Sequence, residues 1–137
     1  MNSSTRTALD AALRGGVLLA GLWAFSKLWD AVTPGPHETD IGGGLAGIGL
    51  VVLGALVWGA VDGRRRAPGR LALTWVGAGL VMSACVEVLV VVQGGERGDV
   101  LFALVALPVF LTAAVALPAV VAGALSAAVG HRRGPVA

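Results

Sequence analysis

Four long apolar stretches, separated by short polar segments, make up most of the chain. They cover residues 11–32, 41–61, 71–93 and 100–130. A run of about 18 or more residues with few charges is long enough to cross a bilayer as a helix. The pattern therefore predicts an all-α, polytopic integral membrane protein with four transmembrane helices, forming a single domain over residues 1–137.

Composition indicates the same class of protein. Hydrophobic residues make up 56% of the chain and charged residues 13%, against about 45–50% and about 25% in soluble domains. Little sequence remains for a soluble catalytic domain, and there is no Ser/His/Asp arrangement, phosphate-binding loop or Cys/His metal motif. We therefore expect no enzyme activity, cofactor, metal site or nucleic-acid partner. The single cysteine, Cys85, excludes a disulfide within the chain.

Basic residues fall mostly on one side of the predicted spans. With the amino terminus in the cytoplasm, eight of the ten lie inside, and Lys27 and Arg97 lie outside. Short loops with such a bias orient a membrane protein, so we expect both termini on the cytoplasmic side of a bacterial inner membrane. Asp10 and Arg14 are spaced as an i,i+4 pair near the inner end of the first span. Helix-end ion pairing, or retention at the interface, is expected at the inner end of the second span for Asp62, Arg64, Arg65 and Arg66.

Small residues recur along the second stretch at intervals of four or eight, at Gly43, Gly47, Ala55, Gly59 and Gly63. Such stripes let two membrane helices approach closely. The partner is either another helix of the same chain or a second copy of the protein, and both alternatives stay open. In the fourth stretch, Pro108 and Pro118 each remove a backbone hydrogen bond and are expected to kink the helix.

One carboxylate, Glu87, lies within the otherwise almost wholly apolar residues 82–93. An ionisable side chain facing lipid is costly, so Glu87 should turn into the helix bundle. Spacing of four residues puts three further side chains on the same helix face. They are Trp75, Gly79 and Ser83.

Lys27 offers one way to satisfy Glu87. It lies about 7.5 Å from the outer end of its span and Glu87 about 9 Å from the outer end of its own, so an ion pair between the two is one hypothesis. The second hypothesis is that Glu87 binds a proton or a cation in a wet cavity. The third is a carboxylate that reaches the interface without a fixed partner. Asp30, three residues after Lys27 on the same helix, competes for the ammonium group.

Residues 57–80 resemble a known family. The segment WGAVDGRR (residues 58–65) closes the second span, and LTW (residues 73–75) opens the third. These motifs, the four spans and the length are similar to the small actinobacterial membrane proteins that form a bacterial four-helix family of the drug/metabolite transporter superfamily. The inner loop RRRAPGR is shorter and less acidic than is usual in that family. The resemblance implies transport of a small solute.

Two functional hypotheses follow. In the first, the protein is a small transporter, homo-oligomeric in the bilayer, in which Glu87 binds a proton or a cationic solute. Lys27 then supplies a counter-charge, and Ser83 and Trp75 line the same face. In the second, it is a non-transporting accessory subunit that packs against a larger membrane protein complex through its glycine stripe.

Overall fold

The computed structural model describes residues 2–33, 41–92 and 105–132 of the chain. They form four helices: α1 (Ser3–Val32), α2 (Ile41–Gly63), α3 (Pro68–Val92) and α4 (Leu107–Arg132). Each contains a stretch long and apolar enough to cross a membrane, and the described residues include no strand. The predicted all-α chain with four membrane-spanning helices is therefore confirmed.

Two helix starts differ from the sequence prediction. α1 begins at Ser3 rather than at residue 11, because the apolar run marks only the part of a helix that can lie in the bilayer and leaves out its more polar first turns. α4 begins at Leu107, and residues 93–104 are not described. Pro108 is thus the second residue of α4, where a helix needs no N–H donor. Residues 105–106 precede it in a π-helical turn, so the expected kink at Pro108 stays a prediction, and Pro118 alone lies in the interior of α4.

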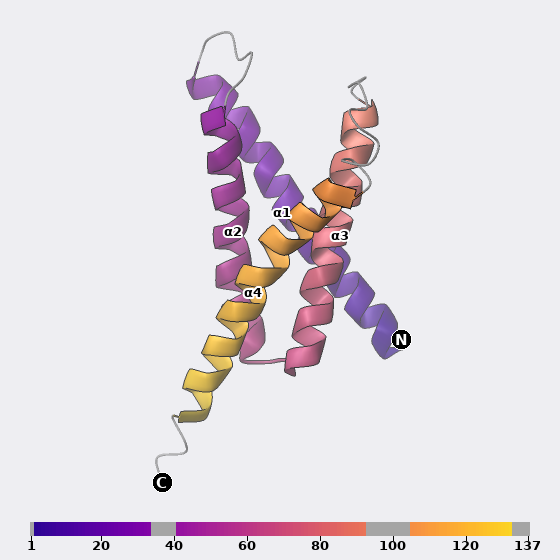
Figure 1. The fold of residues 1–137 in the computed structure, drawn as a ribbon, viewed down its shortest axis with the longest axis vertical. Helices are drawn as coiled ribbons and strands as arrows, with labels where there is room; N and C mark the ends of the chain where they lie inside the picture. The colour runs from indigo at the N-terminus through magenta and orange to yellow at the C-terminus, as the bar shows by residue number, and fades with distance from the viewer. Residues whose placement is uncertain (1, 34–40, 93–104, 133–137) are drawn as a thin grey trace.

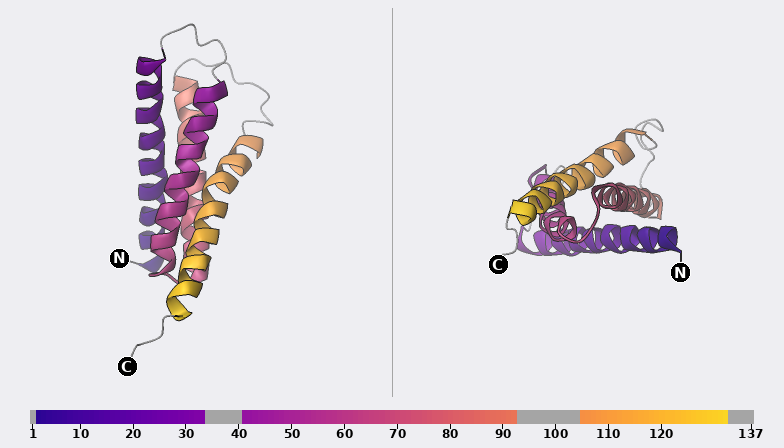
Figure 2. Two further views of the ribbon diagram at one scale, coloured as in Figure 1. Left: turned by 90° about the vertical axis from the view of Figure 1, so that its left-hand side faces the viewer. Right: turned by 90° about the horizontal axis from the view of Figure 1, so that it is seen from below.

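The four helices form three layers (Figures 1 and 2). α2 and α3 form an antiparallel hairpin, α1 covers one face of it, and α4 covers the other. α2 and α3 touch each other little, whereas α4 packs extensively on both of them and α1 mainly on α3. The outer helices therefore hold the hairpin together.

α1 crosses the hairpin from α3 to α2. In its first half, a Cβ placed on Gly15 would lie 2.6 Å from the carbonyl oxygen of Ala78 in α3. In its second half, Leu22 lies against Gly47 of α2, 2.8 Å from the Cβ position of that glycine. The end of α1 has thus left α3 and lies beside α2, as Figure 1 shows.

α4 also crosses from α3 to α2, in the opposite direction along the bundle. Its Thr112 lies against Gly79 of α3, whose Cβ position is 2.6 Å from the Cα of Thr112. Further along, the backbone of Ala119 lies against Gly59 of α2, and the backbone of Gly123 lies against Gly63. These glycines are needed because a side chain at either position would force the two helices apart.

The buried core is small and lies where the four helices cross. Trp75 is fully buried at its centre, with apolar side chains from all four helices around it. Large apolar side chains elsewhere on every helix are exposed. In a bilayer the lipid chains cover those faces, so close helix packing and polar links, rather than hydrophobic collapse, hold the bundle together.

Candidate functional site

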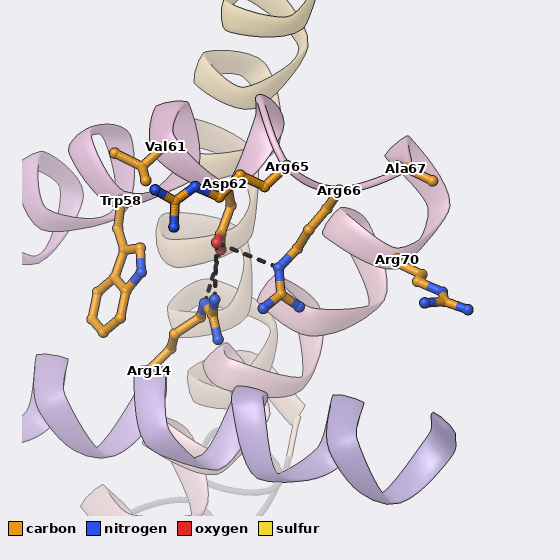
Figure 3. A pocket seen from close by; sticks show the side chains of 8 residues that line it. All are labelled: Arg14, Trp58, Val61, Asp62, Arg65, Arg66, Ala67 and Arg70. Carbon is orange, nitrogen blue, oxygen red and sulfur yellow. Dashed lines mark hydrogen bonds and ion pairs between the residues drawn. The ribbon is translucent and has the colours of Figure 1, made fainter. Parts of the chain in front are cut away.

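A buried ion pair joins α1 to α2 at the end of the bundle that holds the short α2–α3 connection. Arg14 of α1 is 4% exposed and Asp62, in the last turn of α2, is 5% exposed. Nε and Nη2 of Arg14 each donate a 2.9 Å hydrogen bond to a separate carboxylate oxygen of Asp62 (Figure 3). This two-bond geometry is the strong form of a carboxylate–guanidinium contact.

A second arginine and a second acid complete the charge network. Arg66 donates from Nη2 to Oδ2 of Asp10 at 2.7 Å, and its Nε lies 3.4 Å from Oδ1 of Asp62. Arg14 also donates from Nη1 to the backbone carbonyl oxygen of Asp10 at 2.8 Å. Two carboxylates and two guanidinium groups therefore neutralise one another. The backbone N–H groups of Arg65 and Arg66 both donate to the carbonyl of Asp62 at 2.9 Å, which closes the end of α2 and places the carboxylate.

Two tryptophans pack on this network. The Cζ of Arg14 lies 5.2 Å from the ring centre of Trp58 and 5.9 Å from that of Trp75. The two rings meet edge to face, with centroids 6.3 Å apart. A guanidinium within about 6 Å of an aromatic face is attracted to it, so the tryptophans stabilise the buried side chain of Arg14 in this position.

A pocket of about 620 Å³ opens beside the ion pair, and we call it the basic pocket. Figure 3 shows its described lining, with side chains from α1, α2, the connection and the start of α3. Four of these residues are arginines and one is an acid. The lining residues are Arg14, Trp58, Val61, Asp62, Arg65, Arg66, Ala67 and Arg70.

A second group of polar atoms lies on α3 and α4. Oε1 of Glu87, Oγ of Ser83 and Oγ1 of Thr112 are buried and have no hydrogen-bond partner within the described ranges. Ser83 and Glu87 are one helical turn apart on α3, and Thr112 of α4 packs against Gly79, one turn before Ser83. Three unsatisfied oxygens on two packed helices are unusual, because buried polar groups normally find partners.

The structure does not bring Lys27 to Glu87. The side chain of Lys27 is exposed, and none of the ion pairs found in the described part of the chain joins it to Glu87 or to Asp30. The two residues were expected at the same depth in the bilayer, but depth does not say which helices are neighbours. α1 has crossed over to α2 before it reaches Lys27, so Lys27 lies beside α2 and not beside α3. The hypothesis of a Lys27–Glu87 pair therefore finds no contact to support it.

Trp75 and Glu87 share a face of α3 but not a site. Twelve residues separate them, or about 18 Å along the helix. Trp75 packs on Arg14 and Trp58 at the other end of the bundle, and its Nε1 has no partner among the described residues. Ser83 is the predicted site residue that does lie close to Glu87, one helical turn before it on α3.

The helix-end pairing expected for Asp62 is present only in part. Its sequence neighbour Arg66 pairs with it at 3.4 Å, whereas Arg64 donates to Oγ of Ser126 in α4 at 2.9 Å. Asp62 pairs with Arg14, 48 residues away. A signal was available: both residues lie at the predicted inner ends of adjacent spans, so the depth comparison used for Lys27 would have suggested this pair as well.

The glycine stripe of α2 is divided between two neighbours. Gly59 and Gly63 contact α4, and Ala55 is fully buried on the same face. Gly47 contacts α1, and Gly43 lines a groove between α1 and α2. The stripe thus contacts other helices of the same chain.

The described residues contain no group of three or more histidines, cysteines or acids placed to hold a metal ion. The segment HETD, residues 37–40, which combines a histidine with two acids, lies outside the described residues.

No protein-family model, curated protein or solved structure matches the chain. The resemblance of residues 57–80 to the four-helix transporter family therefore stays a prediction. The assignment as a membrane protein with four spans stands on helix length and composition.

Proposed function

We propose that this multi-pass membrane protein is a small transporter, similar to the four-helix drug/metabolite transporter family, that moves a proton or a small cationic solute. The observation that carries the proposal is the buried Oε1 of Glu87, which has no partner among the described residues. The proposal places the protein in a bacterial inner membrane with both termini in the cytoplasm, as the distribution of basic residues indicates.

An intramembrane carboxylate without a partner is costly unless it takes up a proton or a cation. Glu87 lies five residues before the end of α3, about 7.5 Å from that end. Ser83 is about 6 Å further in, and its hydroxyl oxygen and that of Thr112 are also unsatisfied. Ser83 and Glu87 on α3 and Thr112 on α4, which packs against Gly79 of α3, each offer an oxygen ligand.

The contact between Gly79 of α3 and Thr112 of α4 blocks the passage of a cation from Glu87 toward the cytoplasmic side. Gly79 and Thr112 touch so closely that no side chain fits between α3 and α4 at that level. In the proposed mechanism Glu87 loads from the nearer, outer side, and α3 and α4 must separate below Thr112 before the cation can leave inward. Four short helices enclose little volume, so in this proposal the protein acts as a homo-oligomer and a neighbouring protomer beside α3 and α4 completes the path.

The test is carbodiimide labelling of the protein in lipid nanodiscs, read by mass spectrometry at Glu87 over a range of pH. We expect labelling near neutral pH that sodium, potassium or tetraphenylphosphonium suppresses. Glu87→Gln is the control for site assignment, and the exposed carboxylate of Asp30 reports on general reactivity. Labelling that appears only after unfolding would contradict a proton- or cation-binding role.

An accessory role is the second candidate, and open glycines favour it. Gly21 of α1 and Gly44 of α2 have nothing within 4 Å of their Cβ positions, and membrane helices dock at such small residues. Co-purification in a mild detergent separates the two functions. A larger membrane protein recovered in fixed stoichiometry supports the accessory role, whereas a self-contained oligomer supports transport.

A further inference from the structure

The basic pocket holds more positive charge than its acids neutralise. Arg14 and Arg66 are committed to Asp62 and Asp10. The guanidinium groups of Arg65 and Arg70 are exposed and form no hydrogen bond or ion pair with any residue that the structure describes. Two positive charges at this pocket are therefore available to an anion.

The arrangement of these arginines suits a group larger than a single small ion. In Figure 3, Arg65 and Arg70 lie on opposite sides of Arg66, whose guanidinium is already held by the two acids. The pocket between them has a volume of about 620 Å³. Guanidinium groups bind phosphate oxygens through directed, paired hydrogen bonds, so a phosphate-bearing group matches both the charge and the space.

The start of α3 adds to the positive field. α3 begins at Pro68 and has no acidic residue in its first turn, and Ala67 and Arg70 at this helix end line the pocket. The first intrahelical bond in this turn is donated by Leu71 to Ala67, which leaves the N–H groups of Gly69 and Arg70 without helical partners. Such N–H groups and the helix dipole favour an anion.

One wall of the pocket is apolar and open to the bilayer. Trp58 and Val61 form this wall, and Val61 is 45% exposed. A lipid could therefore place its headgroup among the arginines with an acyl chain along Val61. Basic pockets between membrane helices on the cytoplasmic side bind anionic headgroups in this way.

We propose that the basic pocket binds a phosphate-bearing anion, supplied either by the headgroup of an anionic membrane lipid or by a free phosphate ester. The proposal is independent of transport through Glu87, which lies near the other end of α3. It rests on the two unused arginines, the start of α3 and the pocket that they share.

The test is native mass spectrometry of the detergent-purified protein with phosphatidylglycerol or phosphatidylcholine added. We expect retention of phosphatidylglycerol over phosphatidylcholine, and a loss of roughly tenfold or more in that retention for the double variant Arg65→Gln/Arg70→Gln. The matched control is Arg6→Gln/Arg64→Gln, which removes the same charge from the same end of the bundle without touching the pocket lining. Thermal unfolding of both variants verifies that each is folded.

Competition identifies the source of the phosphate. If millimolar inorganic phosphate or glycerol phosphate displaces phosphatidylglycerol, the ligand is a soluble ester. If neither displaces it, the ligand is a lipid headgroup. Equal losses in the two double variants, or equal retention of the two lipids together with no binding of glycerol phosphate, would overturn the proposal.

Discussion

Arg14 and Asp62 are charged residues at the ends of two apolar stretches, and each is almost fully buried. Their two short hydrogen bonds and the neighbouring tryptophan faces offset the loss of water. Removing one partner of such a pair leaves an uncompensated buried charge, which costs far more than the intact pair contributes. The ion pair therefore acts chiefly to fix where α1 meets α2.

Asp62→Asn should lower the free energy of unfolding by about 3 kcal/mol, because Arg14 keeps its charge and loses its partner. The change is measured by thermal or denaturant unfolding in detergent, monitored by the near-UV circular dichroism of the tryptophans. Replacing both residues, as Arg14→Met/Asp62→Leu, should recover much of the loss, since Arg66 keeps its bond to Asp10. Asp30→Asn, at an exposed carboxylate, is the control and should change little. Additive losses in the double variant would refute the coupling.

Glu87→Gln should leave the stability nearly unchanged, because the carboxylate has no partner in the described structure to lose. A double-mutant cycle with Lys27→Met should give a coupling energy below about 0.5 kcal/mol, as for residues that share no contact. The same Glu87→Gln variant should abolish carbodiimide labelling at position 87. A coupling energy above about 1 kcal/mol, which is typical of residues in contact, would support the hypothesis of a Lys27–Glu87 ion pair.

At the scale of helices, the sequence predicts which segments form helices better than it predicts which helices touch. The bounds of α2 and α3 lie within a few residues of the predicted stretches, because Gly and Pro punctuate the connection between them. The start of α1 was missed, since the apolar run marks only the part of a helix that can lie in the bilayer. Which helix lies beside which could not be predicted, because periodicity reports a face and a depth but not the neighbour on that face.

Gly59→Ala should destabilise the α2–α4 contact by about 1–3 kcal/mol, the range for overpacking. The added Cβ would run into the backbone of Ala119, which cannot move aside as a side chain could. Gly49→Ala is the matched control in the same helix, because nothing lies within 4 Å of its Cβ position. Unfolding midpoints of the two variants should move in opposite directions or differ clearly. Equal midpoints would show that α2 and α4 do not meet at Gly59.

At the scale of the whole molecule, the distribution of basic residues predicts the orientation of the protein in the membrane, which the fold alone does not predict. The basic pocket, the buried ion pair and most arginines gather at the end of the bundle with the short α2–α3 connection. A bias of eight basic residues to two should hold this end in the cytoplasm. Binding of a cytoplasmic-leaflet headgroup in the basic pocket and loading of Glu87 from outside both require this orientation.

Reporter fusions test the orientation directly. Green fluorescent protein fused after residue 137 should fluoresce, and alkaline phosphatase fused after residue 33 should be active, because the first folds in the cytoplasm and the second outside it. Exchanging the two reporters should silence both. Activity in the exchanged arrangement would reverse the assigned topology.

Although α1 and α4 pack on both α2 and α3, these two helices are joined directly to each other at one end only. α2 and α3 are joined there by a short connection, by the edge-to-face tryptophans and by the arginine that lies over both rings, yet the two helices touch little elsewhere. Away from that end only α1 and α4 link the two helices, so we expect the separation of α2 from α3 to fluctuate more the further it is measured from the connection. Spin labels on the far ends of these helices should give a broader distance distribution than labels beside the connection, and the amplitude of any opening at Glu87 is then governed by residues about 20 Å away from it.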